Sequence, residues 1–407
     1  MSKSHFKGIL AAYLASMVLL HAFLGWKATG LIHEGYPDFT IFYSAARMIR
    51  GGLSGELYDP AAQFRSQQEF ASRVATRQSA LPYNHPPYEA LLFVPISWLP
   101  YWAAFVIWDV VNLAILFFLA RLVRPHLQVL KNLSTPACLF ASLAFFPVFI
   151  VLLQAQDSLL FLLVLTLAFI ALKSKRDYEA GIWLGLGLFR FHLLLSILAG
   201  LLWQRRYRVV PSFLSVACVL AIVSVFTVGW RQSLTYPSYV WHMEGDAAQQ
   251  GMRAPLNMPN LRGLLAMTHL PLNIAPVGKV ITMLLALGLI IFMAVMWKQM
   301  ESIGNPLGFC LALLSTVITA YHSFAHDLCI LLLMTAILTD YVVTNRMKGW
   351  NAIALLGPAI LIACTPLNMY LWFRRGQFAL IVMVLLFWFW AIWRSIHPTE
   401  PERVGVS

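Results

Sequence analysis

Long apolar runs without charge recur along this chain, and they restrict its fold more than any other feature. Leu284–Trp297 and Ala379–Trp393 contain no charged residue. A helix that crosses a bilayer needs about 20 mostly apolar residues, and lipid offers backbone polar groups no partner outside their own helix. The sequence therefore predicts an all-α polytopic membrane protein, with a single transmembrane domain over residues 1–400 and about 11–13 spanning helices.

Two of the predicted spans are irregular. The stretch 90–120 is too long for one simple span, and Pro95 and Pro100 are expected to divide it into a short piece and a full helix. The runs at 179–190 and 192–203 are short, so they form one broken helix or two partial ones. The other spans are expected at residues 8–26, 135–153, 157–172, 209–229, 276–297, 305–321, 327–343, 350–367 and 377–394.

The distribution of basic residues predicts an orientation. The formal net charge is +12, although only 11% of the residues are charged. With alternating spans, short loops such as 173–176 and 205–208 carry clustered Lys and Arg, whereas the hairpins at 154–157 and 321–327 carry none. By the positive-inside rule both termini are cytoplasmic, including a short tail at 395–407, in what we expect to be a bacterial inner membrane. This positive charge faces membrane lipids rather than nucleic acid, since no soluble basic domain is present.

Two predicted outer segments are long, at 27–89 and 230–276. In the first, apolar residues from Phe39 to Ile49 follow a 3.6-residue period that stops at Gly51-Gly52, which predicts an amphipathic helix at the membrane surface. Loops of such length usually carry function.

The predicted outer side also collects polar residues of unusual kinds. Ionisable groups at membrane depth are costly, so each needs a partner or a task. Histidines and arginines on one side suit the binding of an anionic ligand, and a carboxylate among them can act as a base. These residues are Asp38, His85, Gln156, Asp157, Arg190, His192, Arg253, Asn257, Asn260, Arg262, His322, His326, Asp327, Arg374 and Arg375.

Each of these residues allows two interpretations. Asp38 is a general base that deprotonates a hydroxyl, or a cap of the helix that follows it. Arg190 and His192 bind a phosphodiester, or interact with lipid headgroups. His322 and His326 would share a helix face at i and i+4, where phosphate binding is favoured over zinc because no HExxH pattern is present. We therefore expect no metal and no cofactor.

Several short motifs occur together in a characteristic order. Asp38-Phe39 follows the first span, Asn84-His85-Pro86-Pro87 precedes the second, and Ala155-Gln156, Gly185-Leu186-Gly187 and His326-Asp327 come later. In this order and spacing the chain resembles glycosyltransferase family 87 of the GT-C superfamily, and the resemblance covers nearly the whole chain.

The resemblance implies a membrane mannosyltransferase whose donor is a polyprenyl-phosphate-linked sugar and whose site faces away from the cytoplasm. Asp38 would activate the hydroxyl of a lipid or glycan acceptor, and the segment containing His322 and His326 would hold the donor phosphate. We assign donor phosphate binding to Arg190, His192, His322 and His326, and substrate binding to His85, Gln156, Asp157, Asn257, Asn260, Arg262 and Asp327.

The alternative is a transporter or flippase of polyprenyl-phosphate or lipid-linked glycans. Such proteins favour inverted repeats and helices broken near the middle of the membrane. The sequence shows no repeat, and its polar residues collect on one side.

Overall fold

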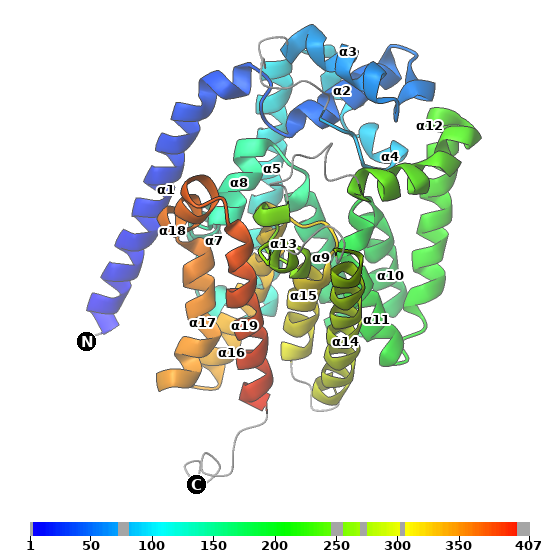
Figure 1. Cartoon of the computed structure of the whole chain (residues 1–407). Coiled ribbons are helices and arrows are strands. Elements are labelled where there is room, and N and C mark those ends of the chain that lie inside the picture. Colours follow the sequence, from blue (N-terminus) through cyan, green and yellow to red (C-terminus); the bar gives the residue numbers. More distant parts are fainter. Residues whose placement is uncertain (1–2, 72–80, 246–254, 269–274, 302–305, 397–407) are drawn as a thin grey trace.

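The computed structural model describes residues 3–71, 81–245, 255–268, 275–301 and 306–396, and within these ranges it contains helices and no strand (Figure 1). Six of the described helices are long and apolar enough to cross a membrane: Gly8–His33, Tyr101–His126, Val209–His242, Val277–Met300, Asp327–Thr344 and Phe378–Ile396. The all-α polytopic fold expected from the sequence is confirmed.

Fewer helices meet this length criterion than the 11–13 spans we predicted, because several apolar segments are bent or short. Thr135–Leu143 and Phe146–Gln154 meet at 78°, and Gly349–Ala363 meets Thr365–Arg374 at 61°. Counting each bent pair as one span gives eight, and the apolar helices Ser158–Lys173 and Leu307–Thr319 are shorter still.

Proline and glycine interrupt the chain where the sequence predicted breaks. A short 3₁₀ turn, Val94–Trp98, precedes α5 (Tyr101–Val123), as Pro95 and Pro100 required. The run near 190 is a pair of partial helices, α10 (Asp177–Leu186) and α11 (Leu195–Trp203), joined by the 3₁₀ segment Gly187–Leu193.

The first outer segment forms a helical layer at one end of the bundle, where α2 and α3 lie beyond the end of α1 (Figure 1). Here α1 is Lys3–His33, α2 is Phe39–Arg50 and α3 is Pro60–Ala71. As predicted, α2 ends at Gly51-Gly52, and Gly52 has a φ of +79°. Its apolar face is buried against aromatic side chains: Phe42 stacks on Phe93 with ring centroids 4.6 Å apart. This packing positions Asp38, the residue immediately before α2.

The main core lies between the helices of the second half and the hairpin of α8 (Phe146–Gln154) and α9 (Ser158–Lys173). Most side chains of α15 (Leu307–Thr319) are buried, so this helix lies inside the bundle. Around it pack α11, α14 (Ala275–Glu301), α16 (Leu331–Thr344) and α19 (Ile381–Ile396), and α17 (Gly349–Ala363) packs against α16 and α19.

Two further helices occupy what the sequence predicted as the second long outer segment. α12 (Val209–Gly245) continues beyond residue 230 after a kink at Gly229, whose φ is +81°. α13 (Leu261–Ala266) follows the short turn Pro255–Asn257. The remaining helices are α4 (Pro87–Ala90), α6 (Gln128–Lys131), α7 (Thr135–Leu143) and α18 (Thr365–Met369).

Candidate functional site

Asp38 lies in the turn between α1 and α2, and its side chain does not cap α2. The backbone position is that of an N-cap, but its carboxylate makes no capping hydrogen bond. Instead Oδ2 accepts a hydrogen bond of 2.8 Å from Nε2 of Gln156, while the backbone N–H donates to Oε1 of Gln154 at 2.9 Å. The carboxylate is thus oriented from the α8–α9 hairpin and is only partly buried.

The α8–α9 hairpin turns sharply because Ala155 adopts a left-handed conformation with a φ of +43°. Gln156 and Asp157 follow directly, and Asn112 on α5 donates to the backbone carbonyl of Gln156 at 3.1 Å. The tight turn therefore places an amide and a carboxylate side by side at the end of two apolar helices.

Arg190 joins this hairpin to the late segment before α16. It has non-helical dihedrals between α10 and α11, and its side chain is almost completely buried. Nη2 donates to Oε1 of Gln156 at 2.9 Å, Nε donates to Oδ1 of Asp157 at 3.0 Å, and Nη1 donates to Oδ1 of Asp327. All three nitrogens thus bind protein oxygens, and a continuous polar chain runs from Asp38 through Gln156 to Asp327.

His322 and His326 lie between α15 and the 3₁₀ helix Asp327–Ile330 that precedes α16, and neither histidine is in a helix. The prediction that His322 and His326 share a helix face is therefore wrong. The turn forms because Oδ2 of Asp327 accepts a hydrogen bond from the backbone N–H of Phe324 at 2.8 Å. His326 Nε2 lies 3.5 Å from Oδ2 of Asp327, and the ring of His322 lies 6.2 Å from that of His192.

Residues of the α13 region contact this same segment. Asn260 caps α13 by accepting from the N–H of Gly263 at 2.9 Å, and its amide donates to the carbonyl of Ala320 at 2.9 Å. The guanidinium of Arg262 lies 4.2 Å from the ring centroid of Tyr321. Asn257 lies in the preceding turn, and its Oδ1 is buried without a partner among the described residues.

A second polar cluster adjoins the hairpin on α4. Nδ1 of His85 lies 3.0 Å from Oε2 of Glu89, and the Glu89 side chain is completely buried. Burial lowers the pKa of His85 to about 4, against an opposing effect of the Asp157 charge. Burial, and next to it the charge of Asp157, raises the pKa of Glu89 well above its ordinary value.

Glu89 was not among the sequence candidates. Its position four residues after His85, in a turn begun by two prolines, is the signal that could have found it.

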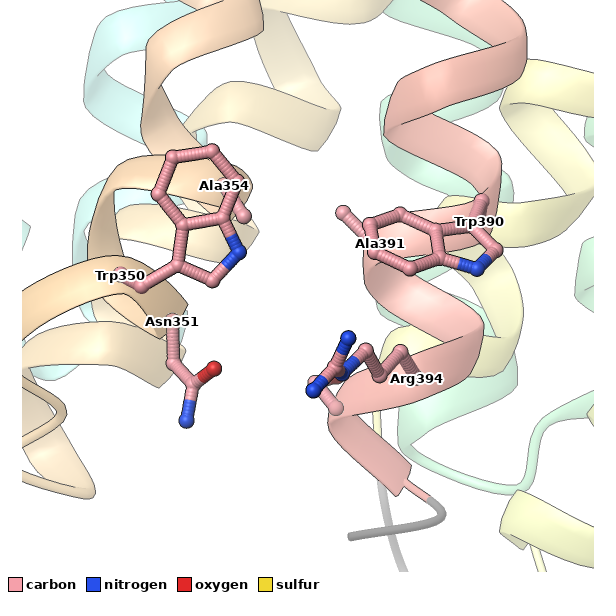
Figure 2. Close-up of a pocket in the computed structure, with 7 residues that line it drawn as sticks. Trp350, Asn351, Ala354, Trp390, Ala391 and Arg394 are labelled. Carbon is pink, nitrogen blue, oxygen red and sulfur yellow. The ribbon is translucent and has the colours of Figure 1, made fainter. Parts of the chain in front are cut away.

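Two of the predicted residues are exposed, and Arg253 lies outside the described residues. Arg374 and Arg375 are exposed, at the end of the helical segment after Thr365. A recess between α17 and α19, lined by Trp350, Trp390 and Arg394 among others, has a volume of only about 10 Å³ (Figure 2). It lies at the end of the bundle opposite α2 and has room for no more than a water molecule (Figure 1).

Comparison with known proteins gives the site its context. Residues 83–320, more than half of the 407, match the model of Glycosyltransferase family 87. The chain belongs to glycosyltransferase family 87. Neither a curated protein nor a solved structure matches it. This family 87 protein is accordingly a membrane glycosyltransferase, and Gln156, Asp157 and Arg190 fall inside the matched range whereas Asp38 precedes it.

Proposed function

We propose that this family 87 protein transfers a sugar, mannose, from a polyprenyl-phosphate donor to a hydroxyl of a lipid or glycan acceptor, with Asp38 as the general base. The observation that carries this proposal is the orientation of the Asp38 carboxylate. It is held by Gln156 instead of capping α2, and it lies in a partly open position at the end of a membrane helix.

The chemical step is a single displacement. Asp38 takes the proton of the acceptor hydroxyl as its oxygen attacks the anomeric carbon. The bond from that carbon to the phosphate oxygen breaks, and its electron pair leaves with the polyprenyl phosphate. Because the phosphate leaves as an anion, no general acid is required, and attack from the opposite side inverts the anomeric centre.

Histidines are the groups that we assign to the departing phosphate. His192 and His322 have neighbouring rings. His326 lies beside Asp327, which Arg190 and Gln156 link to Asp38. Positive or hydrogen-bonding groups placed where charge develops stabilise the transition state.

Arg190 has a different role in this proposal from the one we expected. All three of its nitrogens donate to Gln156, Asp157 and Asp327, so we assign it to positioning these residues rather than to direct phosphate contact. Asp327 in turn holds the turn that carries His322 and His326.

The acceptor is assigned to the side of α13. Asn260 and Arg262 link α13 to residues 320 and 321, which directly precede His322. Asn257, three residues before Asn260, has a buried side-chain oxygen, Oδ1, that could accept a hydrogen bond from the acceptor. We assign His85, Gln156 and Asp157, from the turn before α4 and from the α8–α9 hairpin, to the substrate as well. The positive-inside pattern supports a site on the non-cytoplasmic face of a bacterial inner membrane, with both termini in the cytoplasm.

Transfer assays on purified protein test the assignment of Asp38. With a polyprenyl-phosphate-mannose donor, Asp38→Asn is expected to lower turnover by about 10²- to 10⁴-fold, the usual contribution of a general base. Glu34→Gln is the matched control, because it makes the same change in the same turn and is expected to retain activity. Near-normal turnover of Asp38→Asn would contradict the proposal, and tight donor binding without sugar release from the wild-type protein would favour a flippase.

A further inference from the structure

Three side chains next to the proposed site form a compact set of metal-ligand atoms. One ligand atom each from His85, Glu89 and Asp157 lies within 4.8 Å of the other two. They come from two elements, α4 with its preceding turn and the α8–α9 hairpin. An imidazole with two carboxylates is a ligand set typical of zinc and manganese.

Two oxygens of this set receive no hydrogen bond from an N–H or a hydroxyl of the described residues. These atoms, Glu89 Oε1 and Asp157 Oδ2, are buried, and the two carboxyl groups lie within hydrogen-bonding reach of each other. Both side chains have no exposed surface. A buried carboxylate oxygen without a donor is costly, so each needs a proton or a cation.

A divalent cation would satisfy both oxygens at once, because Glu89 and Asp157 come from different elements and their carboxyl groups lie within reach of each other. The guanidinium of Arg190 does not serve these two oxygens, since its nitrogens donate to Gln156, to Oδ1 of Asp157 and to Asp327. A proton shared between the carboxyl groups of Glu89 and Asp157 is the alternative that metal binding would exclude.

In contrast to the expectation from the sequence that no metal is bound, we propose that His85, Glu89 and Asp157 bind one divalent cation of the zinc or manganese type. Asp157 would use Oδ2, because its Oδ1 already accepts hydrogen bonds from Arg190. Three protein ligands leave at least one coordination position for water or a substrate oxygen. The cation fastens α4 to the hairpin that orients Asp38 through Gln156.

Equilibrium metal binding tests this inference without any sugar donor, so its outcome is separate from that of the proposed function. Protein purified in detergent is stripped with a chelator, titrated with Zn²⁺ or Mn²⁺, and desalted for elemental analysis. We expect one bound equivalent in the wild type. His85→Asn and Glu89→Gln are expected to weaken binding at least about tenfold, and His126→Ala, a histidine outside the cluster, is expected to bind as the wild type. Asp38→Asn should also bind the metal normally.

A measurement on the unmodified protein covers the case in which the variants fail to fold. Co²⁺ added to the stripped wild type is expected to give visible absorption bands of a four- or five-coordinate nitrogen and oxygen site, and Zn²⁺ should abolish them. A spectrum of hexaaqua Co²⁺, or binding without one-to-one stoichiometry, would overturn the proposal and favour a proton shared between Glu89 and Asp157.

Discussion

Gln156 donates a hydrogen bond of 2.8 Å to the carboxylate of Asp38, although 118 residues separate the two in the chain. The same amide accepts a hydrogen bond from Arg190 at 2.9 Å, which fixes its orientation. The position of the proposed base therefore depends on a hairpin in another part of the protein.

Replacing Gln156 with Met removes both hydrogen bonds while keeping a side chain of similar size. A hydrogen bond to a charged group contributes about 1.5–3 kcal/mol, so we expect kcat to fall about 10- to 100-fold. The KM for the donor should change little, because Gln156 contacts the base and not the phosphate. Steady-state kinetics check this, with the exposed Gln128→Met as control; an increase in KM at unchanged kcat would refute the positioning role.

Removing Arg190 should destabilise the fold strongly. Arg190→Met removes the guanidinium that pairs with the buried carboxylates of both Asp157 and Asp327, and breaking a buried ion pair in this way typically costs about 3–5 kcal/mol in the free energy of unfolding. Thermal unfolding in detergent measures the change. Because the two side chains form one network, adding Asp327→Asn to Arg190→Met should cost less than the sum of the single changes. Additive effects would show that the two residues are independent.

Alkaline pH should destabilise the protein through Tyr83. Burial, together with the nearby Glu89, raises the pKa of Tyr83 well above its ordinary value. The folded state keeps a proton that the unfolded chain releases near pH 10, so stability falls as the pH rises above about 10. Tyr83→Phe should make this dependence less steep but not abolish it, because burial also raises the pKa of Tyr58 and Tyr88. The variant also loses the hydrogen bond to the carbonyl of Pro86, worth about 1 kcal/mol at neutral pH. Chemical unfolding between pH 8 and 11 measures the free energy of unfolding of both proteins. Equal slopes of this free energy against pH would contradict this account.

The contact of α10 with α12 should tolerate no added methyl group at Gly181. A Cβ there would collide with the backbone carbonyl of Val209 and the hydroxyl of Ser212. Membrane helices approach this closely only through small residues, so Gly181→Ala is expected to destabilise by about 1–3 kcal/mol. Gly288→Ala on α14, where a Cβ would meet nothing within 4 Å, is the matched control and should not lower the melting temperature.

Local features were the most predictable from sequence. The 3.6-residue period from Phe39 and the following Gly51-Gly52 gave the bounds of α2, and Pro95 and Pro100 gave the break before α5. Both rest on short-range backbone and burial preferences, which a single sequence records directly.

Side-chain partnerships across the bundle were less predictable. The sequence marked Asp157, Arg190 and Asp327 as costly at membrane depth, but it could not show that they neutralise one another, because this depends on how α9, α10 and α16 pack. The helix expected at His322 and His326 did not form, since the carboxylate of Asp327 bonds the backbone N–H of Phe324 and stabilises a turn instead.

The ion network also determines how late in synthesis the protein can complete its fold. Asp38 leaves the ribosome long before Gln156, and Arg190 is made 137 residues before Asp327. Until residue 327 has been synthesised, the inserted part of the chain holds an arginine with one of its two acidic partners missing. Completion of the fold must therefore wait for the last third of the sequence. Chains that end earlier leave Nη1 of Arg190 without its acceptor, a polar defect by which a membrane protease could recognise them.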